Sequence, residues 1–225
     1  MRYSSTRGES PPVTFDRAVI EGQAPDGGLY IPMSIPDKPI SGLRDASSPA
    51  ELARRVFPDW IGKEVDAALA EEAFAIEIPV VDLGATSSRY DGIHVVELFH
   101  GPTGSFKDFG ARFLARWLSS EIPSPRRRRI VLVATSGDTG GAVADGFAGQ
   151  PGTSVVVLYP FEGVSAYQRA QLTKAREGVF SFGVRGPFDD CQRAVKDAFR
   201  DPELSELQLT SANSINIGRL LPQML

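Results

Sequence analysis

The chain has 225 residues, of which 42% are hydrophobic and 23% charged, a balance typical of a globular protein with a buried core. Its formal net charge of −4 argues against nucleic-acid binding, which usually requires a basic surface. No run approaches the ~18 apolar residues of a membrane span, and the first residues lack the apolar segment of a secretory signal. Because Cys191 is the only cysteine, no internal disulfide is expected and a cytoplasmic location is predicted.

The first part of the chain, residues 1–90, carries short helical patterns between turn signals. Helices are predicted at residues 14–22, 50–57 and 63–74. Thr14 is a suitable N-cap for the first of these, which stops at Gly22. This part is predicted to be a helical and irregular N-terminal domain.

The second part, residues 91–225, alternates apolar runs with helical patterns. Strands are predicted at residues 93–99, 130–134, 155–159, 179–184 and 208–209. Helices are predicted at residues 108–120, 140–149, 165–175 and 188–199. Such alternation is typical of βαβ units, so the sequence predicts an α/β fold with a parallel sheet. The arginine run at 126–129 directly precedes a strand and is predicted to be a solvated loop.

The last stretch, residues 215–225, reads as a helix that begins after an asparagine cap signal and stops before any C-cap. A helix that is only half built suggests that the fold continues beyond this sequence. We therefore expect the C-terminal part of the fold to be missing.

Lys107 lies where a turn-rich segment, the lysine loop (residues 101–106), meets an amphipathic helix. A nucleophilic lysine must be partly deprotonated, and therefore needs a desolvated or electropositive setting. Phe106 and Phe109, together with the positive end of the helix dipole, would supply that setting. The alternative is an exposed lysine in the first helical turn, and spacing alone leaves both open.

A second loop, the glycine loop (residues 135–140), runs from a predicted strand into a helix of small residues. Backbone amides and the helix dipole make such a junction a binding site for anions. Hydroxyl groups come from Thr135, Ser136 and Thr139, with Gly137 and Asp138 between them. The alternative is a plain turn in which glycine serves the geometry and Asp138 caps the helix.

A third loop, the asparagine loop (residues 211–216), contains Asn213 and Asn216. Asparagine caps helices and also offers a ligand both a donor and an acceptor, so both roles stay open. Cys191 is expected to be buried in a helix. The histidines, His94 and His100, have no acidic partners at triad or metal-ligand spacing, so neither a histidine-based hydrolase nor a metal site is predicted.

Seven blocks of sequence together resemble the threonine synthase family, and they occur in the family's order over nearly the whole chain. These blocks are residues 3–8, 26–32, 97–103, 106–109, 134–140, 158–160 and 211–216. The resemblance implies the type II fold of pyridoxal-phosphate enzymes. It also implies conversion of O-phospho-L-homoserine and water to L-threonine and phosphate.

By this resemblance, Lys107 carries pyridoxal 5'-phosphate as a Schiff base and afterwards moves protons at Cα and Cβ of the substrate. Phe106, Asn213 and Asn216 are expected to lie near the cofactor. The substrate is expected to contact Ser165 and the glycine loop, where Thr135, Ser136, Gly137, Asp138 and Thr139 would hold its carboxylate.

The chain departs from the family in two ways. Where relatives carry a basic residue and a Ser-Pro-x-Gln segment, residues 161–168 keep Ser165 and Gln168 but place the acidic Glu162 nearby. That acid would repel a substrate phosphate. Family members are also roughly twice as long, and their loop for the cofactor phosphate lies beyond Leu225. The isolated chain is therefore expected to bind the cofactor weakly and to form little threonine.

Two other functions are compatible with the sequence. A related phospho-lyase would eliminate phosphate and yield a 2-oxo acid, and a non-catalytic remnant would keep only the folded first half. An apolar face left uncovered would favour self-association or a complementing chain. No nucleic acid, membrane or metal is expected among the partners.

Overall fold

A four-stranded parallel sheet forms the centre of the second part of the chain. The computed structural model describes residues 1–122 and 128–225. The strand order is β7-β6-β5-β8, and every pairing within this sheet is parallel. The strands are β5 (Arg129–Ala134), β6 (Thr153–Pro160), β7 (Val179–Val184) and β8 (Leu209–Thr210). The predicted α/β class and parallel sheet are therefore confirmed.

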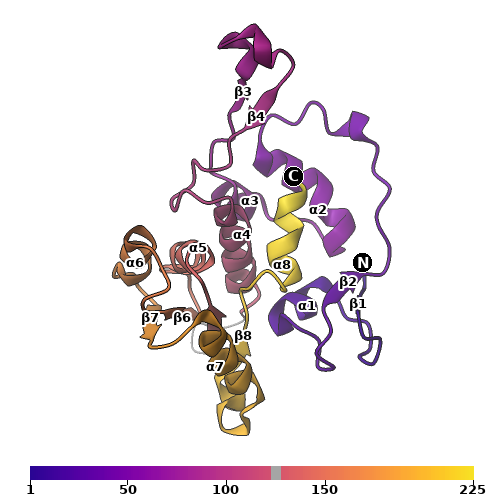
Figure 1. The fold of residues 1–225 in the computed structure, drawn as a ribbon. Coiled ribbons are helices and arrows are strands. Elements are labelled where there is room, and N and C mark those ends of the chain that lie inside the picture. The colour runs from indigo at the N-terminus through magenta and orange to yellow at the C-terminus, as the bar shows by residue number, and fades with distance from the viewer. Residues whose placement is uncertain (123–127) are drawn as a thin grey trace.

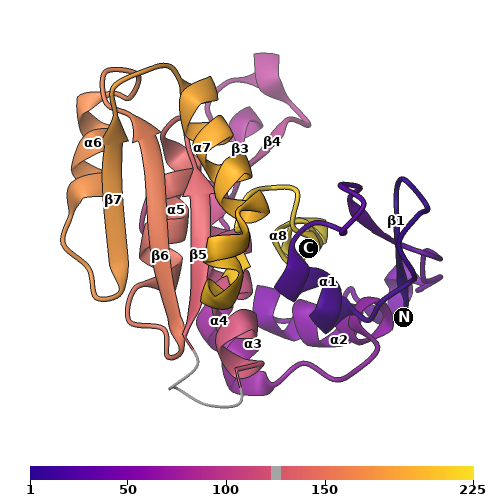
Figure 2. The same cartoon turned by 90° about the horizontal axis from the view of Figure 1, so that it is seen from below.

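Helices cover both faces of this sheet (Figure 2). One face packs on α4 (Lys107–Ser120) and α5 (Asp138–Phe147), with Val133 and Val157 in the buried cluster. The opposite face packs on α7 (Phe188–Arg200), where Cys191 is fully buried as predicted. The helix α6 (Ala166–Thr173) lies beside α5. The central strands β5 and β6 are covered on both faces and read as apolar runs, which explains why the sequence located them well.

The N-terminal part packs on the other side of α4. It contains β1 (Tyr3–Ser5), α1 (Phe15–Glu21), β2 (Tyr30–Pro32), α2 (Pro49–Ile61) and α3 (Ala67–Ala73). Thr14 and Gly22 cap α1 as predicted. The Trp117 indole of α4 packs edge-on against Phe15 and donates to Asp16 at 3.0 Å. One buried cluster thus runs through both parts, and a domain boundary at residue 90 stays a prediction.

The C-terminal helix lies between α4 and α1 (Figure 1). The predicted helix over residues 215–225 consists of α8 (Ile217–Leu220) followed by a 3₁₀ turn. The 3₁₀ turns of the chain include Ile40–Gly42, Leu83–Ala85, Ser88–Tyr90, Pro202–Leu207 and Leu221–Met224. Within the predicted arginine loop, Arg126 and Arg127 lie outside the described residues, and Arg129 opens β5.

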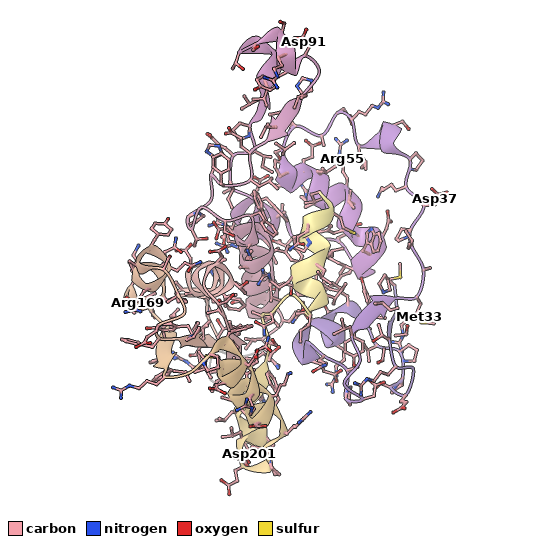
Figure 3. The ribbon with its side chains drawn as sticks, in the orientation of Figure 1. Met33, Asp37, Arg55, Asp91, Arg169 and Asp201 are labelled. Carbon is pink, nitrogen blue, oxygen red and sulfur yellow. The ribbon has the colours of Figure 1, made fainter. Side chains whose placement is uncertain are left out.

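Three predicted elements differ from the structure. The predicted strand at 93–99 is only β4 (His94–Val96), which pairs antiparallel with β3 (Val80–Asp82) instead of joining the parallel sheet. The two strands form a projecting hairpin with Asp91 near its tip (Figure 3). The helix predicted to end at residue 57 continues through Pro58, because Ile61 is buried in the core. The helix predicted from residue 63 begins at Ala67, after the Asp66 cap.

Neither a membrane span nor a metal centre is found among residues 1–122 and 128–225. No helix there is long and apolar enough to cross a membrane. The same residues contain no group of three histidine, cysteine or acidic side chains arranged to hold a metal ion.

Candidate active site

The lysine loop is fixed by a buried carboxylate. Asp108 is 1% exposed, and its Oδ1 and Oδ2 accept hydrogen bonds from the Thr103 hydroxyl at 2.6 Å and the Thr103 amide at 2.9 Å. Burial raises the pKa of Asp108, although the bonds from Thr103 oppose that shift. A Cβ atom at Gly101 would lie 2.4 Å from Oδ2, so only glycine fits there. The loop is therefore held firmly against the first turn of α4.

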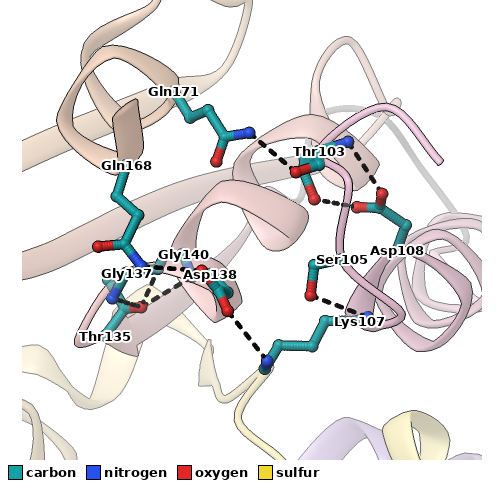
Figure 4. Close-up of polar contacts among 10 residues, drawn as sticks. All are labelled: Thr103, Ser105, Lys107, Asp108, Thr135, Gly137, Asp138, Gly140, Gln168 and Gln171. Atoms are coloured by element: carbon teal, nitrogen blue, oxygen red, sulfur yellow. Dashed lines mark hydrogen bonds and ion pairs between the residues drawn. The ribbon is translucent and has the colours of Figure 1, made fainter. Parts of the chain in front are cut away.

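Lys107 begins α4, and its side chain extends into an open pocket at the carboxyl end of the sheet. Its Nζ lies 3.5 Å from Oδ2 of Asp138 (Figure 4) and 4.8 Å from the centre of the Phe106 ring. The pocket has a volume of about 480 Å³, and Phe99, Phe106 and Tyr167 are among its lining residues. It therefore offers a flat ring aromatic walls beside a lysine amine.

The glycine loop is held by a buried threonine. The Thr135 hydroxyl is a hydrogen-bond acceptor for the amides of Gly137 at 3.0 Å and Gly140 at 2.8 Å. Thr135 is 1% exposed, so its hydroxyl serves the loop, and a contact with substrate stays a prediction. Gly137 has φ of +145°, and a Cβ atom there would lie 2.2 Å from Nε2 of Gln168. Glycine is thus required both by conformation and by space.

The same loop leaves several amides open at the start of α5. Within the described residues, the backbone amides of Ser136, Asp138 and Thr139 donate to no protein acceptor. Ser136 is exposed and Thr139 is half-buried. Unpaired amides at a helix N-terminus attract anions, so the geometry fits the anion site predicted from the sequence.

The Asp138 carboxylate itself is turned toward Lys107. Its Oδ1 accepts a hydrogen bond from Nε2 of Gln168 at 2.8 Å, while Oδ2 faces the lysine. These two neighbours hold the pKa of Asp138 below its usual range, with the Gln168 hydrogen bond as the larger cause. An ionised carboxylate repels a second one. The amides and hydroxyls of the loop therefore suit a substrate carboxylate better than the Asp138 side chain does.

The asparagine loop uses its two asparagines differently. Asn216 is fully buried; its Nδ2 donates to the carbonyls of Val19 at 2.9 Å and Ser211 at 2.8 Å, and its Oδ1 accepts from the Gly218 amide at 2.9 Å. A contact between Asn216 and a cofactor stays a prediction: both hydrogens of Nδ2 are engaged, so only Oδ1 could accept a further hydrogen bond. The half-buried Asn213 has no side-chain hydrogen bond to the described residues and is therefore the better candidate.

Helix α6 and its cap contribute Ser165 and Gln168, which are both kept from the family segment, and Gln171, which no sequence motif had identified. Ser165, a predicted substrate contact, caps this helix: its Oγ accepts from the Gln168 amide at 3.2 Å. Gln168 binds Asp138, and Gln171 donates to the Thr103 carbonyl at 2.9 Å. Both glutamines thus connect α6 to loops far away in sequence. For Gln171 the polar face of α6 was the only available signal, and for neither glutamine does the sequence indicate the partner.

Comparison with known proteins defines the class of protein. The sequence model of the pyridoxal-phosphate dependent enzyme family matches residues 72–217 of this chain. These residues include the lysine, glycine and asparagine loops. The chain belongs to the pyridoxal-phosphate dependent enzyme family. The cofactor expected from the sequence is thereby confirmed as that of the family.

Within this family, the resemblance is to threonine synthases. Residues 2–73 match the model of the threonine synthase N terminus. The chain is 36% identical to threonine synthase of Escherichia coli over all of its own length and 52% of that protein, and 37% identical to the Schizosaccharomyces pombe enzyme over 99% of this chain and 46% of that one. The predicted resemblance to this family's N-terminal half is confirmed.

Solved structures support the same relationship. Pyridoxal-phosphate-bound threonine synthase from Brucella melitensis matches with a TM-score of 0.87 at 37% identity, covering 99% of this chain and 50% of that one. The yeast enzyme matches with a TM-score of 0.82 at 34% identity, covering 99% and 48%. The chain thus spans about half the length of the relatives it matches.

Proposed function

We propose that this chain is the lysine-bearing portion of a threonine synthase, which converts O-phospho-L-homoserine and water to L-threonine and phosphate. The observation that carries the proposal is the position of Lys107. Its amine enters an aromatic-lined pocket, directly beside a helix N-terminus with open amides. Threonine synthases are also the relatives that match the whole chain.

The residues around Lys107 fit pyridoxal phosphate. When bound, this cofactor supplies an aldehyde that captures amines and a ring that withdraws electrons. Lys107 would hold it covalently through Nζ, and the same nitrogen would take up and return protons at the substrate carbons. The ring would lie near Phe106, and Asn213 would offer its side-chain amide, which has no hydrogen bond to the described residues. Asn216 is retained as a cofactor neighbour only on the strength of the family resemblance.

The substrate carboxylate would bind at the glycine loop. The amides of Ser136 and Thr139 and the Ser136 hydroxyl would donate to it, with Gly137 allowing close approach. Thr135 would act indirectly by holding this geometry, and Ser165 by capping α6. Asp138 would face the positively charged amino groups at the centre of the site.

Covalent trapping tests the proposed lysine. The chain would be incubated with pyridoxal phosphate, reduced with borohydride, digested and analysed by mass spectrometry. We expect a pyridoxyl group on Lys107 and its loss in Lys107→Arg, which keeps the charge. Labelling spread evenly over the other lysines, with none preferred, would overturn the proposal and would also favour the non-catalytic remnant.

A related lyase that forms a 2-oxo acid is a second candidate, because the turn after β6 departs from the family pattern. Glu162 is exposed in that turn, next to Phe161, on which the Arg169 guanidinium stacks. The turn itself, residues 161–164, contains no basic residue, and Arg169 reaches it from α6. Product analysis with O-phosphohomoserine separates the two functions, since a 2-oxo acid without threonine would favour the lyase.

Location and assembly remain predictions. We propose a reducing compartment, the cytoplasm, in which the buried Cys191 stays a thiol, and cell fractionation would test this. Self-association, or assembly with a complementing chain, would involve exposed apolar residues such as Phe180 and Phe182 of the edge strand β7. A monodisperse monomer in light scattering would count against it.

A further inference from the structure

Gln168 connects helix α6 to the glycine loop through a side-chain amide that is bonded at both ends. Its Oε1 accepts from the Ser165 amide at 3.0 Å, and its Nε2 donates to Oδ1 of Asp138 at 2.8 Å. Reversing the amide would turn its oxygen toward a carboxylate and its NH₂ toward a backbone N–H, so both bonds would be lost. The orientation of Gln168 is therefore fixed by its partners.

The glycine loop also packs directly against this amide. The nearest atoms to a Cβ built on Gly137 all belong to Gln168, at 2.2 to 2.7 Å. The absence of a side chain at Gly137 thus allows the amide to lie on the loop backbone and reach Asp138. Since Asp138 follows Gly137 directly, Gln168 contacts the loop at the residue whose carboxylate it orients.

The carboxylate then has its other oxygen free to face Lys107. With Oδ1 engaged by Gln168, Oδ2 lies 3.5 Å from Nζ of Lys107, as Figure 4 shows. The remaining titratable side chain that lines this pocket is Tyr167. Asp108, adjacent to Lys107 in sequence, is turned toward Thr103. Asp138 is therefore the anionic group that faces the lysine amine from α5, and α6 contributes the neutral Gln168.

We propose that Gln168 is a positioning residue. By binding one oxygen of Asp138, it directs the other toward Lys107 and so governs how readily Nζ attacks a carbonyl carbon. The biological meaning of this role rests on the function proposed above for Lys107. The geometry on which it stands needs no cofactor.

Reductive methylation of Lys107 with formaldehyde and cyanoborohydride, followed by mass spectrometry, measures this effect directly. In Gln168→Met the carboxylate is free to turn to solvent, so the ion pair that engages Nζ of Lys107 is weakened. We expect methylation at mildly alkaline pH to accelerate about two- to fivefold, the range that corresponds to a partly exposed ion pair. Asp138→Asn should produce a similar or larger acceleration.

The double variant shows whether Gln168 acts through Asp138. Once Asp138→Asn has removed the charge, adding Gln168→Met should change the methylation rate little further. Gln171→Met is the matched control, because it removes an equivalent glutamine hydrogen bond from the same helix to Thr103 without touching Asp138. Additive effects of the two site substitutions, or an equal acceleration in Gln171→Met, would overturn the proposal.

A second measurement guards against a folding defect. Gln168→Glu keeps an acceptor for the Ser165 amide but replaces the donor to Asp138 with a negative charge. The carbon-13 carboxyl signal of Asp138 should then titrate at higher pH than in the unmodified chain, and an unchanged titration would contradict the proposal. Since neither readout uses pyridoxal phosphate, failure of borohydride trapping would refute the proposed function and leave this inference standing.

Discussion

The glycine loop and the asparagine loop share one design, in which a strand end leads through a polar turn into a short helix. They use their hydrogen-bonding groups in opposite ways. In the glycine loop, Thr135 accepts hydrogen bonds from two amides, and the neighbouring amides have no acceptor in the part of the chain that the structure describes. In the asparagine loop, all the hydrogen bonds of the Asn216 amide lie within the chain. A polar motif therefore indicates a ligand site only where its hydrogen-bonding groups are left without partners in the protein.

The largest loss of stability should come from Asn216→Ala. The substitution leaves the Val19 and Ser211 carbonyls and the Gly218 amide without their partner in a buried site. We expect the free energy of unfolding to fall by about 2–4 kcal/mol. Urea denaturation followed by circular dichroism measures it. A loss well under ~1 kcal/mol would mean that this asparagine is not the structural group described here.

Thr135→Val should cause the next largest loss of stability. Valine keeps a similar shape but accepts no hydrogen bond, so the buried amides of Gly137 and Gly140 lose their acceptor. We expect a loss of about 1–3 kcal/mol in the same denaturation experiment. A neutral result would show that the glycine loop holds its shape without the threonine hydroxyl.

Asp138→Asn should change the pH dependence of stability more than stability itself. Because the pKa of Asp138 is lowered in the folded chain, its contribution is present above the pKa of the unfolded chain and is lost as pH falls through the folded pKa. The variant should therefore lose less stability than the unmodified chain between neutral pH and about pH 3. The difference should be small, since the Asp138 side chain is 51% exposed. If the free energy of unfolding, measured by urea denaturation at each pH, changed with pH equally in both proteins, the lowered pKa of Asp138 would be contradicted.

Ser136→Ala should have the smallest effect on stability. The Ser136 hydroxyl is exposed and makes no hydrogen bond within the described residues. We expect a change within about 0.5 kcal/mol. A larger loss would place Ser136 with Asn216 among the structural groups and would remove it from the candidate anion site.

The parallel sheet could be predicted because its central strands β5 and β6 are covered on both faces and its helices are amphipathic. Periodicity failed where burial was absent: β4 has the same β-branched composition as a core strand, yet Val96 is 54% exposed in a projecting hairpin. The continuation of α2 past Pro58 also depends on the tertiary contact of Ile61, which local rules do not include.

The candidate site was predictable only in part. Lys107 and the glycine loop stand next to helix starts, a local pattern that the sequence displays. The bond from Gln168 to Asp138 joins residues 30 positions apart, and the capture of Asn216 by Val19 joins residues 197 apart. Such partners are determined by packing, and sequence reasoning about a single loop does not reveal whether its polar groups remain free.

The bond between Asn216 and Val19 also bears on how the chain is made. The last turn of α1 obtains its partner from a residue synthesised almost at the end of this sequence. Trp117 and Asp16 form another link across a long sequence interval. Contacts of this kind slow folding, because distant segments must meet before either is stabilised. During synthesis, α1 must therefore wait for α8, and the buried side chain of Val19, which packs at Gly218 of α8, remains open to chaperones and to aggregation until α8 is made.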